Sequence, residues 1–198
     1  MHQKIFHAFN QICRAHAIRG RVLEIGATPD ASTLLSLPAL ARATEKIGIN
    51  KAGASRYGNF TILSGDANAM TCFPDRHFDA VLSNSVLEHD PFFWRSLTEM
   101  RRVARPRALI VIGAPGYGQG RHEKVIRRWL AILPRWLHPA DGWALQHSTL
   151  TLGLHNYPGD YYRFSEQAFR EVFLEGLERT TLRSILNPPR FIGSGIMP

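Results

Sequence analysis

The feature of this sequence that most constrains its fold is a series of short apolar runs separated by longer amphipathic stretches. We expect the runs at 21–25, 46–50, 61–64, 78–83 and 108–114 to be β-strands. The stretch 91–103 is the clearest helix between them, because its apolar residues recur near one helical face. Strands that alternate with helices predict an α/β fold with a parallel sheet and right-handed crossovers.

After Ala114 the pattern changes. Gly116, Gly118 and Gly120 open a flexible stretch, and a basic amphipathic segment follows it. We interpret both as part of a lid-like insert at about 115–163. Ser165 is a predicted N-cap for a helix that runs to about residue 175. The runs 177–186 and 190–197 are predicted strands, and the short turn between them requires an antiparallel pair. We therefore expect one domain over 1–198.

Composition sets the class of protein. The 198 residues are 44% hydrophobic and 20% charged, which is typical of one globular domain. No apolar run approaches the roughly 20 residues that span a bilayer, and the first residues show no signal peptide. The two cysteines form no metal-ligand pattern, so we expect a cytoplasmic protein without a metal. The net charge of +8 permits anionic partners but does not choose between them.

Polar and small residues stand where the predicted strands end, which is where ligands bind in open α/β sheets. Glu24 is a carboxylate inside an apolar strand, and Gly26 follows that strand directly. A buried carboxylate needs a cation or hydrogen-bond donors, so Glu24 is either a ligand contact or a capping, salt-bridged residue. Thr28 and Ala31 stand where the dinucleotide fingerprint would have glycine, and the phosphate-binding P-loop pattern is absent.

The ordered motifs VLEIG, GIN, SGDANAM, FDAVLSNSVLEH, EMRRVARP and ALIVIGAP resemble those of class I S-adenosylmethionine-dependent methyltransferases. The later segment HNYPGDYYRFS resembles small-molecule members of that group. The resemblance implies a Rossmann-like α/β fold in three αβα layers. Its sheet would have seven mostly parallel strands, with the last one antiparallel.

The same resemblance implies a site for S-adenosylmethionine. Glu24 would meet the methionine ammonium, Asp66 would accept from the adenine amino group, and Asn50 would take the place of the usual acidic ribose ligand. Thr28 replaces the usual second glycine, so the sequence departs from the family at both Thr28 and Asn50. The implied cofactor residues are Glu24, Gly26, Ala27, Thr28, Asn50, Lys51, Asp66, Ala67, Ser83, Asn84 and Ser85.

The acceptor side offers two candidate general bases. His155 lies in the loop expected to return over the cavity, and His89 follows the fourth predicted strand. A hydroxyl acceptor needs such a base, whereas a neutral amine needs mainly positioning. His89 has an alternative role, because it could cap the next helix or bond a backbone carbonyl. The predicted substrate-binding residues are Tyr157, Asp160, Tyr161 and Arg163.

Alternatives remain open on this side of the molecule. Arg163 could bind an acceptor carboxylate or phosphate, or it could pair with Asp160 to stiffen the loop. The basic insert could touch an anionic membrane, but a lid that packs its tryptophans on the domain is favoured. The leading hypothesis is methyl transfer to a small or carrier-linked metabolite, with oxygen slightly preferred and a sugar-type acceptor. A noncatalytic S-adenosylmethionine-fold module and, less favoured, an RNA methyltransferase are the alternatives.

Overall fold

The computed structural model describes residues 1–117, 151–154 and 159–198. These residues form one mixed sheet of eight strands in the order β3-β4-β2-β1-β5-β6-β8-β7. The strands are β1 (Arg21–Ile25), β2 (Glu45–Asn50), β3 (Ser55–Tyr57), β4 (Phe60–Ser64), β5 (Phe78–Asn84), β6 (Ala104–Pro115), β7 (Glu178–Leu186) and β8 (Pro189–Ile196).

The sheet confirms the predicted topology and corrects its strand number. Strands β4, β2, β1, β5 and β6 are parallel neighbours, and β8 runs antiparallel to both β6 and β7. The additional strand is β3, which pairs antiparallel with β4 at the edge of the sheet. Sequence analysis missed it, although the residues Gly58-Asn59 between two short runs are typical of a two-residue hairpin turn.

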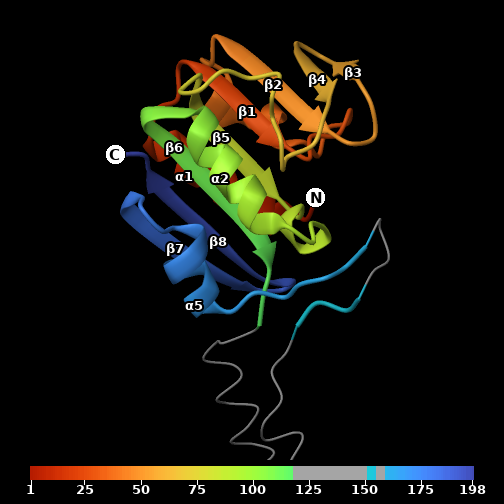
Figure 1. Ribbon diagram of the computed structural model, residues 1–198, viewed down its shortest axis with the longest axis vertical. Helices are drawn as coiled ribbons and strands as arrows, with labels where there is room; N and C mark the ends of the chain where they lie inside the picture. Colours follow the sequence, from red (N-terminus) through yellow and green to blue (C-terminus); the bar gives the residue numbers. More distant parts are fainter. Residues whose placement is uncertain (118–150, 155–158) are drawn as a thin grey trace, which may run out of the picture.

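Helices cover both faces of the sheet, so the three layers are present (Figure 1). Helix α1 (Gln3–Ala15) packs on one face, where its buried residues Ile5, Phe9 and Ile12 follow a helical repeat that sequence analysis had overlooked. Helix α2 (Phe93–Val103) packs on the other face through Leu97 and Met100, as predicted.

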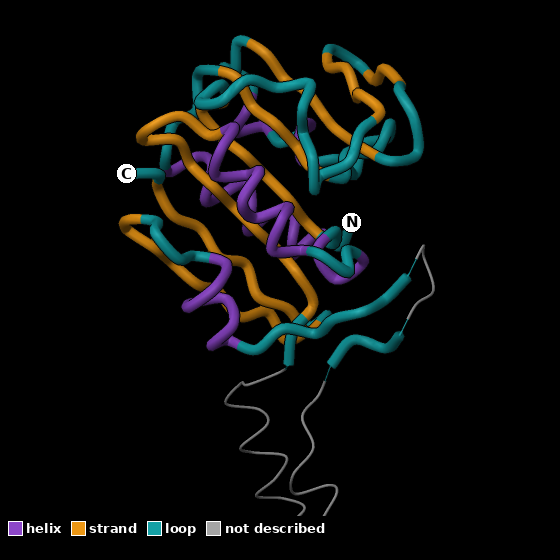
Figure 2. The backbone as a smooth tube through the Cα atoms, viewed as in Figure 1, coloured by secondary structure: helices purple, strands orange, loops and turns teal. Residues whose placement is uncertain are grey.

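The crossovers between the first strands contain little regular helix, and Figure 2 shows them almost wholly as loop. Between β1 and β2 there are only two 3-10 turns, η1 (Leu34–Ser36) and η2 (Pro38–Leu40). After β5 comes a third 3-10 turn, η3 (Leu87–His89).

The last part of the chain closes the fold against β6. Ser165 caps the predicted helix, because its hydroxyl accepts a hydrogen bond from the Ala168 N–H at 3.0 Å. That helix is α5 (Glu166–Ala168), continued by the π-helical turn η5 (Phe169–Phe173).

In the described part of the chain, no helix is long and apolar enough to cross a membrane.

Candidate cofactor site

A cavity of about 280 Å³ lies at the carboxyl ends of the central parallel strands. Small-molecule sites typically measure roughly 300 to 1,000 Å³, so this cavity is just below that range. Each of β1, β2, β4 and β5 contributes residues from the loop that follows it. The lining residues are Ile25, Gly26, Thr28, Ile49, Asn50, Lys51, Gly65, Asp66, Ala67, Asn68, Ser85, Val86, His89 and Asp90.

Gly26 shapes the part of the cavity that follows β1. Its φ of +80° is in the left-handed region, and its N–H donates to the carbonyl of Ile49 at 2.8 Å. A Cβ at this position would come within 2.3 Å of the Val86 methyl group Cγ2. The position therefore requires glycine for both its backbone conformation and the close approach of Val86.

Asn50 ties two of these loops together instead of presenting a free amide. Its Nδ2 donates to the carbonyl of Ala27 at 2.7 Å, and its Oδ1 accepts from the Ala52 N–H at 3.0 Å. Ala27 itself is buried and does not line the cavity, whereas Thr28 does. The predicted ribose position is thus occupied by an amide that already has partners on both sides.

Asp66 presents a carboxylate to the cavity at the end of β4. Burial opposes the ionised form of this group, but hydrogen bonds from Asn68 and Lys51 outweigh it and hold the pKa of Asp66 below its usual value. The Nζ atom of Lys51 lies 3.1 Å from Asp66 Oδ2, and both side chains are well exposed. An exposed pair of this kind contributes little to stability, so it can rearrange when a ligand enters.

Glu24 lies elsewhere than the resemblance implied. Its carboxylate is 4% exposed and does not line the cavity. It accepts hydrogen bonds from the Thr33 hydroxyl and from the N–H groups of Leu34 and Leu35, the latter two at 3.0 and 3.1 Å. Glu24 thus caps η1, as the capping interpretation predicted, because that 3-10 turn leaves N–H groups that need an acceptor. Its contact with a methionine ammonium remains a prediction.

The three predicted residues at the end of β5 differ in their surroundings. Ser83 is fully buried and does not reach the cavity, whereas Ser85 lines it. Asn84 and Ser85 both accept hydrogen bonds from Arg190 Nη1, at 2.7 and 3.0 Å. Sequence analysis did not predict Arg190, which comes from β8 more than 100 residues later in the chain.

His89 lines the cavity, but its ring is held by protein groups. Its Nδ1 donates to the carbonyl of Gly159, and its Nε2 lies 3.9 Å from Glu88 Oε1. The Glu88 carbonyl accepts from the N–H groups of Tyr161 and Tyr162 at 2.8 and 3.3 Å. His89 thus bonds a backbone carbonyl, as the alternative interpretation predicted, and helps to dock the segment 159–164 beside the cavity. Its catalytic role remains a prediction.

The substrate-binding predictions fall on this docked segment and on residues outside the described ranges. Asp160 and Arg163 form an ion pair, and their side chains are only 3% and 7% exposed. Arg163 also donates to the carbonyls of Leu152 and Gly153. The pair therefore stiffens the loop, which was the second interpretation. Tyr161 is exposed.

His155 and Tyr157 lie outside the described residues, as does most of the predicted lid-like insert. Their predicted roles in catalysis and substrate binding therefore remain predictions. Asp90, which sequence analysis also missed, lines the cavity and orders its rim. Its carboxylate accepts from the Ser96 hydroxyl at 2.6 Å and from Asn68 Nδ2 at 3.0 Å.

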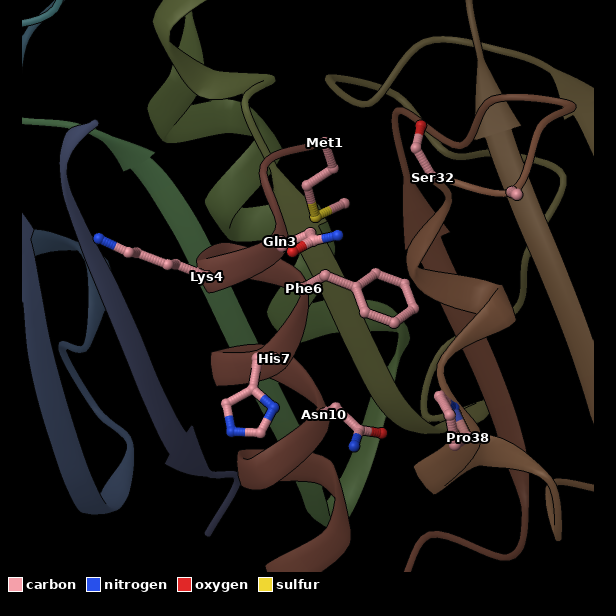
Figure 3. Close-up of a pocket in the computed structure, with 9 residues that line it drawn as sticks. Met1, Gln3, Lys4, Phe6, His7, Asn10, Ser32 and Pro38 are labelled. Carbon is pink, nitrogen blue, oxygen red and sulfur yellow. The ribbon is translucent and has the colours of Figure 1, made fainter. Parts of the chain in front are cut away.

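A second, larger cavity of about 800 Å³ lies between α1 and the segment 31–38. Phe6 and Asn10 of α1 point toward the segment that carries Ser32 and Pro38, whereas Lys4 points away (Figure 3). None of the predicted site residues lines this cavity. Because ligands of open α/β sheets bind at the carboxyl edge, the smaller cavity is the better candidate.

Comparisons with known proteins relate this chain to methyltransferases. Residues 33–112 match the model of a family described as a methyltransferase domain. Solved structures with the same fold include a chain of the Haloferax volcanii complex that contains the Trm112 methyltransferase activator. It is 14% identical with a TM-score of 0.61, and the alignment covers 99% of this chain and 92% of that one. No curated protein matches this chain.

Two further structures carry ligands of the expected kind. The N-methyltransferase NodS of Bradyrhizobium japonicum WM9, solved with S-adenosylhomocysteine, is 11% identical with a TM-score of 0.59, over 99% of this chain and 87% of NodS. A phosphoethanolamine N-methyltransferase of Haemonchus contortus, solved with S-adenosylmethionine, is 11% identical with a TM-score of 0.59, over 96% of this chain and 52% of that one. Residues 33–112 thus match a methyltransferase domain, and the fold of the chain is similar to that of class I S-adenosylmethionine-dependent methyltransferases.

Proposed function

We propose that the cavity binds S-adenosylmethionine and that the chain transfers its methyl group to a small or carrier-linked metabolite. The observation that supports this best is the convergence of four loops, after β1, β2, β4 and β5, on one cavity at the carboxyl edge of the sheet. Asp66 and Ala67 would hold the adenine, the Gly26–Thr28 segment would pass beneath the ligand, and Ser85 would lie at its methionine end.

When bound, this cofactor supplies an electrophilic methyl group on a sulfonium for in-line displacement. The contribution of the chain is to hold the acceptor in line and to keep water away. The segment 159–164 is docked on η3 through Glu88 and His89, and we propose that it helps to hold the acceptor beside the cavity. We propose that His155 acts as the general base if the acceptor is a hydroxyl. The resemblance of the segment around His155 to small-molecule methyltransferases supports this role.

The acceptor class rests on the resemblance of 155–164 to small-molecule methyltransferases. We keep a hydroxyl, of a sugar-type compound, as the first acceptor to test. The structural neighbours include N-methyltransferases and a carbon methyltransferase, so amines and activated carbons belong in the same panel. An RNA methyltransferase is the less favoured reading, and a strongly salt-dependent RNA affinity would support it.

Two observations favour a noncatalytic binding module as the second candidate. Glu24 caps η1 instead of facing the cavity, and the Asn50 amide already has partners. Fewer polar groups then remain to hold a methionine ammonium and ribose hydroxyls. This candidate differs from the first in its expected affinity for the cofactor.

Isothermal titration calorimetry of the whole chain with S-adenosylmethionine and S-adenosylhomocysteine separates the two candidates. For the enzyme we expect saturable one-to-one binding of both ligands. Transfer of a labelled methyl group to one member of the acceptor panel would complete the evidence. Absence of heat with both ligands would contradict the proposal and favour the noncatalytic module. Binding without transfer to any member of the panel would contradict the proposed acceptor classes.

Asp66 gives a residue-level test of the ligand orientation. We expect Asp66→Asn to weaken binding of adenosine and S-adenosylhomocysteine alike, by about tenfold, because a hydrogen bond to a charged group contributes roughly 1.5–3 kcal/mol. The wild-type chain should also prefer adenosine to inosine, which lacks the amino group, and the variant should lose that preference. Calorimetry with the six combinations of the three ligands and two proteins measures both effects.

The control for this test is Asp75→Asn, which alters an exposed carboxylate paired with Arg102 away from the cavity. Its ligand affinities should equal those of the wild type. An Asp66→Asn variant that still discriminates adenosine from inosine would show that another group reads the adenine amino group.

A further inference from the structure

Arg190 is a cation buried at the end of the sheet that carries the cavity. It stands near the start of β8, opposite Pro115 of β6 and Ile185 of β7, and the residue is 5% exposed. Taking a charge out of water costs several kcal/mol unless other groups satisfy it. The hydrogen bonds of Arg190 therefore identify the groups that it holds in place.

The contacts of Arg190 converge on the segment that ends β5. One nitrogen, Nη1, donates to Asn84 Oδ1 at 2.7 Å and to Ser85 Oγ at 3.0 Å. Asn84 Nδ2 lies 3.2 Å from the same Ser85 hydroxyl. Arg190 does not line the cavity itself, whereas Ser85 does, so any effect of Arg190 on a ligand passes through Ser85.

Ser85 adopts a backbone conformation that needs such support. Its φ is +56°, in the left-handed region that costs a residue with a side chain roughly 1–2 kcal/mol. Its N–H donates to the carbonyl of Gly113 on β6 at 2.9 Å. The backbone of Ser85 is thus fixed from the adjacent strand β6, and its hydroxyl is fixed by Arg190 from β8, one strand farther along the sheet.

The charge of Arg190 is balanced within the same region. Burial lowers the pKa of Arg190, and the buried carboxylate of Glu88 on η3 opposes that change. A positive charge with a nearby counter-charge is retained more easily inside a protein than an isolated one. The arrangement connects β8, the end of β5 and η3 around the same side of the cavity.

We infer that Arg190 is a positioning residue that fixes Ser85 and Asn84 for the methionine part of the cofactor. The assignment rests on the proposed function, because that function gives Ser85 its place at the methionine end. If it holds, loss of Arg190 affects ligands with the amino-acid part and spares ligands that consist only of the nucleoside part.

The test compares two probes by calorimetry, S-adenosylhomocysteine and 5′-methylthioadenosine, which lacks the amino-acid part. For Arg190→Met we expect at least a tenfold loss of affinity for S-adenosylhomocysteine and less than a twofold change for 5′-methylthioadenosine. Arg190→Lys should recover part of the loss, because an ammonium can still donate to both oxygens. Arg183→Met, on the neighbouring strand β7, is the matched control and should change neither affinity.

Equal losses for the two probes would overturn the assignment, since they would indicate a general structural defect, and unchanged affinities would overturn it too. Should Arg190→Met not fold, Ser85→Ala carries the same test, with a selective loss of S-adenosylhomocysteine affinity as the supporting result and equal losses as the overturning one. A wild-type chain that binds neither probe would overturn the proposed function itself and the assignment with it.

Discussion

Replacing Gly26 with alanine is expected to lower the affinity for S-adenosylhomocysteine by a factor of ten or more. The new Cβ would lie 2.3 Å from Val86 Cγ2. Because Val86 lines the cavity, its displacement narrows the space for a ligand. A tenfold loss corresponds to about 1.4 kcal/mol of binding free energy, which calorimetry resolves easily.

Gly176→Ala separates this effect from backbone strain. Gly176 has a φ of +71°, close to the +80° of Gly26, but a Cβ there meets no atom within 4 Å. Both variants should lose stability, by roughly 1 kcal/mol for the left-handed conformation. Only Gly26→Ala should lose affinity. Equal affinities in the two variants would show that the ligand does not bind beside Val86.

Because of Glu24, the free energy of unfolding of the chain should fall as the pH rises from about 5 to 8. Burial raises the pKa of this carboxyl from 4.5 to about 7, and the hydrogen bonds from Thr33, Leu34 and Leu35 only partly oppose that shift. Between these two values the folded chain binds more protons than the unfolded chain does. The stabilisation is therefore complete below about pH 4.5 and is lost as the pH passes through 7.

The size of this effect follows from the shift. At about 1.4 kcal/mol for each pKa unit, the free energy of unfolding should change by roughly 2–3 kcal/mol over that pH range. Urea denaturation at several pH values measures it, and Glu24→Gln should flatten the dependence. Equal slopes in the variant and the wild type, or a wild-type stability that rises with pH, would contradict the assignment to Glu24.

Glu24→Ala is expected to be more damaging than Glu24→Gln. It leaves the Thr33 hydroxyl and two N–H groups of η1 without their acceptor inside the protein. Each buried group that loses its partner costs about 1–3 kcal/mol, so the melting temperature should fall by on the order of 10 °C. Val22 lies in the same strand and is also buried. Val22→Ala is therefore the control variant for the loss of packing alone.

Several parts of the fold were predictable because local sequence decides them. The predicted strand 21–25 is reproduced without change, and the predicted helix 91–103 begins only two residues later, at Phe93. An apolar run or a helical repeat of apolar residues that fits only one kind of element predicts that element without knowledge of the rest of the chain. The cavity location was also predictable, because parallel strands bring their following loops to one edge of the sheet.

Other features depended on groups that local sequence does not bring together. That Glu24 would be buried followed from its neighbours, but which donors it would meet depended on the chain after β1 forming 3-10 turns. The contact between Arg190 and Ser85 joins segments 105 residues apart and exists only because β8 inserts beside β6. The alternation of residues along a strand indicates which face of the sheet a side chain occupies. It does not indicate which residue from another strand or loop that side chain contacts.

The sequence by itself therefore determined seven of the eight described strands, the parallel arrangement of the central ones and the edge at which the cavity lies, since these follow from hydrophobic periodicity and chain connectivity. Only the tertiary structure decided which polar groups at that edge face the cavity and which are used to hold the loops. The physical reason is that each buried polar group takes whichever partner the packing brings within hydrogen-bond distance, and packing depends on the whole chain.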